Sequence, residues 1–132
     1  MSASSYPITG RSVAGSTAVE LAGGTAQWRA DLSPSAGGAG GDPDPHDLLD
    51  SALVACTILT LQLYAKRKQY PLESVEVSLT HDEGGGSYRM NRKVAMTGAL
   101  DAQQRADLLR VANACPIHKA LQSRFEIATE LA

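Results

Sequence analysis

The two cysteines are the residues in this sequence best suited to redox chemistry. Cys56 lies in the apolar run SALVACTILT, residues 51–60, and Cys115 lies in NACPIHKAL, residues 113–121. A thiol reacts as its thiolate, which a helix N-terminus or a nearby cation favours. From the residues alone, the pair has three interpretations: a redox couple, metal ligands, or two small apolar side chains that fill space.

The surroundings of the two thiols differ. Cys56 is expected about eleven residues into its helix, roughly 17 Å from the helix's positive end. The helix dipole therefore gives it little help, and an activating cation must come from elsewhere in the fold. Cys115 directly precedes Pro116, at the expected start of a short helix where backbone N–H groups favour a thiolate. His118 follows in the same segment and could face Cys115.

A zinc site is the second interpretation. Its four ligands would be Cys56, Cys115 and His118 with His46 or His81. Structural zinc sites usually contain closely spaced ligand pairs such as C-x-x-C, and the two cysteines here are far apart in the chain. We therefore predict no metal and no other cofactor.

Cys56 is expected on a long helix over residues 45–67. Asp44 is a plausible N-cap and Pro45 suits the first helical position. The helix should end in the basic run at residues 66–68, and Pro71 prevents its continuation.

The middle of this helix has almost no polar face. Apolar side chains recur all round it: Leu48, Leu49, Ala52, Leu53, Val54, Ala55, Ile58, Leu59, Leu61 and Leu63. A helix that is apolar all round is buried, and one small sheet covers only one of its sides. We infer a homodimer in which two such helices are enclosed between two sheets.

The remaining elements give an α+β order in a single domain, residues 1–132. We expect two strands within residues 8–31, a Gly/Pro-rich loop at 33–45, a hairpin of strands 73–81 and 87–100, a helix capped by Asp101, a short helix after Pro116 and a final strand in RFEIATEL, residues 124–131.

Composition limits the classes of partner. The chain has 12 Lys and Arg residues against 14 Asp and Glu residues, which argues against a nucleic-acid surface. No apolar run reaches the ~18 residues of a membrane span, and the first residues lack a signal-peptide layout. We predict a cytoplasmic protein with no nucleic-acid or membrane partner.

Two motifs resemble the OsmC/Ohr family. They are P-x-D-L-L-x-x-A-L-x-A-C-T, which ends at Thr57, and A-x-x-C-P-x-H-x-x-L, which ends at Leu121. The resemblance covers roughly residues 42–132. It implies an α+β fold and an intertwined homodimer, in which antiparallel sheets enclose two buried central helices and the active sites lie at the subunit interface.

The resemblance also implies a chemistry. Characterised members look like thiol peroxidases that reduce organic hydroperoxides in oxidative stress defence. By this analogy Cys56 attacks the peroxide and becomes a sulfenic acid, and Cys115 condenses with it into a disulfide. A lipoyl protein or a small dithiol would then reduce the pair.

The family's peroxidases pair the reactive cysteine with an N-terminal arginine and with a glutamate ten residues before it. His46 stands at that glutamate position in this chain, and Asp47 is the nearest carboxylate. Arg11 is the first candidate for the arginine and Arg29 the second. His46, Arg29 and His118 are also candidate binding residues around the site.

The departure at His46 keeps a second interpretation open. In it, the dimer binds an apolar small molecule or senses oxidants through the same cysteines without turnover. In the third, both cysteines only fill space, and their sulfurs need not lie near each other.

Overall fold

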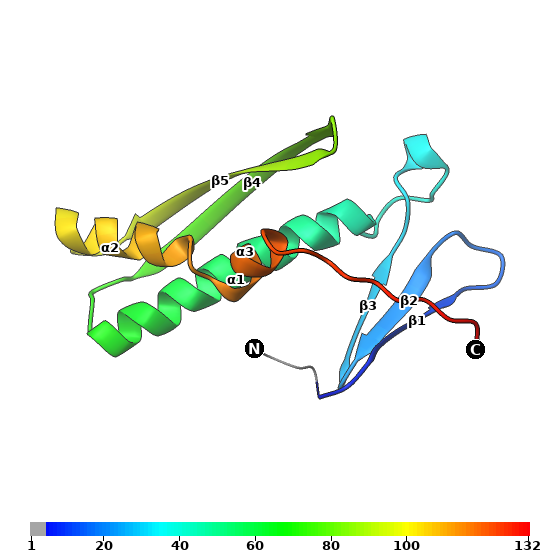
Figure 1. Ribbon diagram of the computed structural model, residues 1–132, viewed down its shortest axis with the longest axis horizontal. Helices are drawn as coiled ribbons and strands as arrows, with labels where there is room; N and C mark the ends of the chain where they lie inside the picture. Colours follow the sequence, from blue (N-terminus) through cyan, green and yellow to red (C-terminus); the bar gives the residue numbers. More distant parts are fainter. Residues whose placement is uncertain (1–4) are drawn as a thin grey trace. The chain divides into compact units, whose positions relative to one another are not determined.

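The computed structural model describes residues 5–132, shown in Figure 1. The chain divides into two compact units, one ending at Leu49 and the other running from Asp50 to Ala132. The boundary between them falls within the long helix α1, Pro45–Lys68. The single domain predicted for residues 1–132 stays a prediction, and each unit is described below by itself.

The first unit is built on a three-stranded antiparallel sheet. Its strands are β1 (Ile8–Ser12), β2 (Val19–Gly23) and β3 (Ala26–Ala30), in the order β1-β2-β3. The prediction of two strands within residues 8–31 is wrong, because a turn interrupts the first one. In this turn the Ser16 N–H donates to the Val13 carbonyl over 3.1 Å, and Gly15 takes a φ of 73°, which is costly for other residues.

The Gly/Pro-rich loop after β3 is present as predicted and is tied to Asp31. A short 3₁₀ turn, η1, covers Pro34–Ala36. The buried Asp31 carboxylate accepts hydrogen bonds from the Thr17 hydroxyl over 2.6 Å and from the Ala39 N–H over 3.1 Å. The Thr17 bond is the main reason that the pKa of Asp31 lies below its usual value. The Asp31 carboxylate therefore ties the loop after β3, at Ala39, to the segment that precedes β2, at Thr17.

Helix α1 starts where the sequence predicts. The Asp47 N–H donates to the Asp44 side chain over 2.9 Å, and the Asp44 N–H donates to the Asp47 side chain over 3.0 Å. These reciprocal bonds satisfy two backbone donors that the helix cannot satisfy itself. At the other end, Gln69 has a left-handed φ of 58° and the Tyr70 N–H donates to the Ala65 carbonyl over 2.9 Å.

The second unit adds a hairpin and two helices to α1. The hairpin joins β4 (Ser74–Gly84) to β5 (Ser87–Thr97). Its turn residues Gly85 and Gly86 have φ of 59° and 79°, which is the two-residue turn that matches strand twist. The hairpin that the sequence predicts is therefore confirmed.

Two helices follow the hairpin. Helix α2 covers Ala102–Ala112 and begins with a capping box between Asp101 and Gln104, so the predicted Asp101 cap is confirmed. Helix α3 covers Pro116–Leu121 and has Cys115 as its N-cap residue. It begins at Pro116, as predicted.

The core of the second unit lies between α1 and α2. It consists of Leu61 and Ala65 from α1 with Leu108, Val111 and Ala112 from α2, and side chains of the hairpin pack against it. Burial of apolar area in this cluster is the main term that holds the helices and the hairpin together.

Helix α1 is buried along one stripe only. Leu53, Thr57, Leu61 and Ala65 are buried, and they follow the four-residue spacing of one helix face. Elsewhere on the helix, Leu59 is 58% exposed and Leu63 is 64% exposed. By length and composition α1 would also qualify as a membrane span, but the core helix of a soluble protein can pass the same test.

The predicted final strand, residues 124–131, is wrong. The chain has no helix or strand after α3, and Phe125 and Ile127 are 61% and 85% exposed. Alternation of apolar and polar residues favours an extended backbone. A strand forms only when a neighbouring strand hydrogen-bonds to its N–H and C=O groups. Neither sheet of the described chain pairs with this segment. The α+β class, with antiparallel sheets and a long central helix, is confirmed.

Candidate functional site

The first turn of α3 brings the two thiols near each other. The Ile117 N–H donates to Cys56 Sγ over 3.5 Å, and the His118 N–H donates to Cys115 Sγ over 3.3 Å. Because Ile117 and His118 are consecutive, two neighbouring backbone donors serve the two sulfurs. Both cysteines are free thiols.

The local sequence explains this arrangement. The Ala114 N–H donates to the Val111 carbonyl over 2.9 Å, which closes the turn after α2. Cys115 then takes an extended conformation, with φ of −66° and ψ of 149°, which the residue before a proline favours. Pro116 starts α3 without needing a backbone donor. The extended Cys115 can therefore turn its side chain back onto the first N–H groups of α3.

The two sulfurs differ in their access to solvent. Cys115 is 0% exposed, whereas Cys56 is half-buried. The Thr60 hydroxyl lies 3.9 Å from Cys56 Sγ, one turn along α1. A molecule from solvent can thus approach Cys56 more easily than Cys115.

An arginine from the hairpin contacts residues that neighbour the two cysteines. Arg92 on β5 donates from Nη1 to the Thr57 hydroxyl over 2.9 Å. Its Nη2 donates to Asn113 Oδ1 over 2.9 Å and lies 3.0 Å from His118 Nδ1. One guanidinium therefore links α1, the end of α2 and α3.

The charge on this guanidinium is not neutralised by a carboxylate. Among residues 5–132, none of the ion pairs involves Arg92. Burial, and then the nearby charge of Arg92, lowers the pKa of His118 below its usual value. The lowered pKa favours the neutral imidazole, in which Nδ1 can accept the Arg92 bond.

Arg92, Asn113 and His118 also line a groove of about 350 Å³. Most of its other lining residues are apolar: Leu53, Met90, Val94, Leu109 and Leu121. The lining thus combines apolar side chains with one cationic and several polar ones, as small-molecule sites often do.

A second polar cluster joins α1 to the hairpin. Asp50 accepts a hydrogen bond from the Tyr88 hydroxyl over 2.8 Å and lies 2.5 Å from His81 Nδ1. The rings of His81 and Tyr88 are stacked with centroids 4.7 Å apart. His81, which the sequence offers as a zinc ligand, thus contacts Asp50. Within the described part of the chain, no three His, Cys, Asp or Glu side chains are grouped so as to hold a metal ion.

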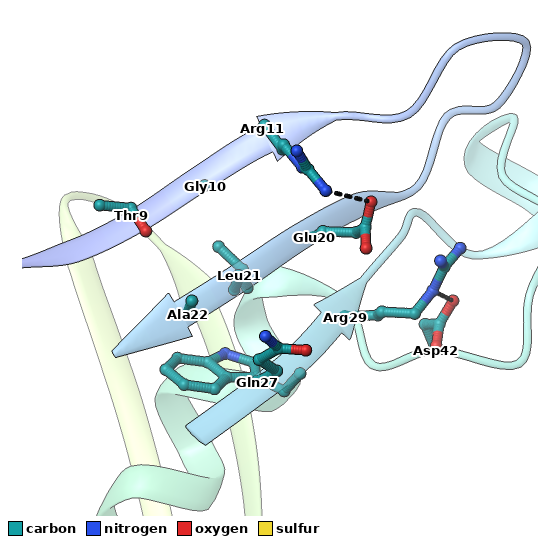
Figure 2. Close-up of a pocket in the computed structure, with 10 residues that line it drawn as sticks. Thr9, Gly10, Arg11, Glu20, Leu21, Ala22, Gln27, Arg29 and Asp42 are labelled. Carbon is teal, nitrogen blue, oxygen red and sulfur yellow. Dashed lines mark ion pairs between the residues drawn. The ribbon is translucent and has the colours of Figure 1, made fainter. Parts of the chain in front are cut away.

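Arg11 and Arg29, the arginines proposed from the sequence, belong to the first unit. Each has a carboxylate partner there: Arg11 lies 3.6 Å from Glu20, and Arg29 lies 3.5 Å from Asp42 (Figure 2). Both line a groove of about 670 Å³ on the three-stranded sheet. Their role toward Cys56 stays a prediction.

Asp47 and His46 lie in the first turn of α1. Asp47 exchanges hydrogen bonds with Asp44, so its carboxylate is engaged in capping the helix. His46 is exposed. The roles proposed for these two residues also stay predictions.

Arg92 is the residue of this site that sequence reasoning missed, although a signal for it exists. Tyr88, Met90, Val94 and Met96 alternate along β5 as its half-buried residues. Arg92 occupies the same register, opposite Leu79 of β4. A charged residue in the apolar register of an alternating strand indicates a buried polar contact.

The fold and the site define an α+β protein with a paired-thiol centre. The chain belongs to the OsmC-like protein family, whose model matches residues 37–130. The resemblance that the two motifs indicate is therefore confirmed. No curated protein matches the chain.

Solved structures support the same fold. An OsmC-like protein from Mycoplasma pneumoniae aligns with a TM-score of 0.77 at 20% identity, over 89% of this chain and 86% of that one. The organic hydroperoxide resistance protein OsmC from Legionella pneumophila gives 0.63 at 20% identity, over 91% and 92%. OhrB of Bacillus subtilis, an organic hydroperoxide resistance protein, gives 0.56 at 23% identity, over 89% and 90%.

Proposed function

We propose that this chain is a thiol-dependent peroxidase that reduces organic hydroperoxides through Cys56 and Cys115. The observation that carries the proposal is the pair of bonds from consecutive N–H groups, of Ile117 and His118, to the two sulfurs. The family match supports it. So do the names of the Legionella and Bacillus proteins, which are organic hydroperoxide resistance proteins.

The difference in solvent access between the two thiols indicates which of them reacts first with the hydroperoxide. A hydroperoxide must reach the sulfur that attacks it, and Cys56 is half-buried while Cys115 is 0% exposed. Cys56 is therefore the attacking thiol, and Cys115 is the one that reacts with the oxidised Cys56 within the protein.

The proposed reaction has three steps. The Cys56 thiolate attacks the terminal oxygen of the hydroperoxide; the O–O bond breaks, and the alkoxide takes a proton and leaves as an alcohol. The Cys115 thiol then displaces water from the Cys56 sulfenic acid, which forms the disulfide. A dithiol reductant, such as a lipoyl protein, reduces this disulfide by thiol exchange and is itself oxidised to a disulfide.

The remaining roles belong to the same proposal. The sequence offers Arg11 or Arg29 to stabilise the thiolate and Asp47 to orient that arginine, and these roles stay predictions. His46 and His118 would border the same site. The protein acts in the cytoplasm, in defence against oxidative stress.

The proposed assembly is a homodimer. Leu59 and Leu63, one turn apart on α1, are 58% and 64% exposed, and apolar side chains exposed together on one helix face are typical of an interface. The alternating C-terminal segment, with its exposed Phe125 and Ile127, also lacks a strand partner within the described chain. A second copy would cover both features.

A non-enzymatic function is the alternative. The groove beside Arg92 has apolar walls and a volume of about 350 Å³, which suits an apolar small molecule. In this alternative the dimer binds such a molecule, or its thiols sense oxidants without turnover.

Consumption of cumene or tert-butyl hydroperoxide, with a dithiol as reductant, tests the enzymatic proposal. The native chain should consume many equivalents, and Cys56→Ser should consume none above background. Ala55→Ser, a change of similar size at the exposed neighbour of Cys56, is the matched control and should retain activity.

Two results would decide against the proposal. Consumption by Cys56→Ser at the native rate would remove Cys56 from the chemistry. Oxidation of the native protein by one equivalent, with no further turnover in excess dithiol, would favour the sensor instead.

A further inference from the structure

We propose that Arg92 supplies the positive charge that promotes the thiol chemistry of Cys56 and Cys115. This inference deepens the proposed function and rests on the same two thiols. It assigns to a strand residue of the second unit the role for which the sequence offers Arg11 or Arg29.

The strand register places Arg92 where a charged side chain is unusual. Residues of β5 alternate between exposed and half-buried, and Arg92 is one of the half-buried set. Its direct partner across the hairpin is Leu79. A guanidinium in such a position loses part of its hydration and needs compensating contacts.

Those contacts lie next to both cysteines. Arg92 Nη1 donates to Thr57, the residue after Cys56. Arg92 Nη2 lies 3.0 Å from the His118 ring, and the backbone N–H of His118 donates to Cys115 Sγ. The guanidinium thus lies between the part of α1 that carries Cys56 and the part of α3 that contacts both sulfurs.

The charge of Arg92 remains available to an anion. Its partners Thr57 and Asn113 carry no charge, and the lowered pKa of His118 favours the neutral imidazole. By contrast, Arg89 on the same strand pairs with Asp82 over 2.5 Å. A cation without a carboxylate partner stabilises a nearby thiolate more than a paired cation does.

The contacts also indicate that Arg92 acts as a positioning residue. Its guanidinium nitrogens contact Thr57, Asn113 and His118, and none of these contacts is with a sulfur atom. Arg92 therefore acts on the thiols through its charge and through the neighbouring residues that it holds.

Alkylation by iodoacetamide tests whether the charge of Arg92 affects the reactivity of Cys56, and it requires no peroxide. The Cys56 thiolate displaces iodide and forms a carbon–sulfur bond, and peptide mass spectrometry resolves the modified cysteine. At pH 7 we expect Arg92→Met to slow alkylation of Cys56 by about tenfold. Arg92→Lys, which keeps the charge, should return the rate to within about threefold of the native value.

Arg89→Met is the matched control, because it removes an exposed arginine from the same strand. Its alkylation rate should equal that of the native chain. Far-UV circular dichroism and the thermal midpoint must show that each variant is folded. If Arg92→Met does not fold, Arg92→Gln replaces it, since it removes the charge but keeps a hydrogen-bond donor.

The result separates this inference from the proposed function. If Cys56 of Arg92→Met is alkylated at the native rate, the inference is overturned. An equal loss of alkylation rate in Arg92→Met and Arg92→Lys, when both variants are folded, would overturn it as well. An alkylation rate that depends on the Arg92 charge would support it even in a protein that consumes no hydroperoxide. In that case only the peroxidase proposal would fail.

Discussion

The Ile117 backbone N–H donates to Cys56 Sγ over 3.5 Å, although the two residues lie far apart in the chain. The bond joins α1 to the first turn of α3, and Cys115 is the N-cap of that same turn. Whatever holds α3 against α1 therefore also holds the two sulfurs near each other.

Leu108 is one of the residues that hold these helices together, and it is 0% exposed in the core between α1 and α2. Leu108→Ala should lower the free energy of unfolding by about 2–5 kcal/mol, because it removes buried methyl groups and leaves a cavity. Urea denaturation measures the change. Leu109→Ala at the exposed neighbour is the control, and an equal loss in both variants would contradict this description of the core.

Local signals made much of the fold predictable from the sequence. Pro45 and the Asp44 cap determine where α1 begins, and Gly85-Gly86 forms the hairpin turn. The motif around Pro116 likewise predicted α3 and the position of Cys115 at its start. Each of these signals depends on backbone preferences within a few residues.

Features that depend on pairing were harder to predict. The turn at Val13–Ser16 interrupts a stretch that would otherwise extend as one strand. The segment after α3 has the alternation of a strand but no partner in the described chain. Arg92 reaches Thr57 and His118 only through the hairpin register, which a search for short motifs does not consider.

Acid should weaken the contact between α1 and α2. Asp107 accepts hydrogen bonds from Arg110 over 2.6 Å and from the Tyr64 and Tyr70 hydroxyls over 2.8 Å each. The Arg110 bond, followed by those of the two tyrosines, lowers the pKa of Asp107 from 3.8 to about 2. Since this pKa is lower in the folded state, the stabilisation is present above about pH 4 and is lost as pH falls toward about 2.

Thermal midpoints between about pH 6 and about pH 2 test this sign. The native midpoint should exceed that of Asp107→Asn above about pH 4, and the difference should shrink as pH falls. Asp82→Asn, which removes an exposed carboxylate paired with Arg89, is the control and should change the midpoint little. A difference between native and Asp107→Asn that stays constant with pH would exclude the Asp107 contribution.

The exposed apolar residues of α1 predict how a charge would affect assembly. Leu63→Glu should convert the proposed dimer into a monomer in multi-angle light scattering, because it places a charge in an apolar interface. Gln62→Glu adds the same charge at an exposed polar neighbour and should leave the dimer intact. A native chain with the mass of a monomer would exclude the proposed assembly.

Disulfide formation between Cys56 and Cys115 is the most direct measurement of the paired-thiol mechanism. The native protein, treated with one equivalent of cumene hydroperoxide and analysed by mass spectrometry without reductant, should lose the mass of two hydrogen atoms. Digestion should then yield a peptide in which the two cysteines are linked. Cys115→Ser should instead accumulate a sulfenic acid at Cys56 that dimedone traps. Two unmodified thiols after this treatment, or oxidation of Cys115 alone, would contradict the mechanism.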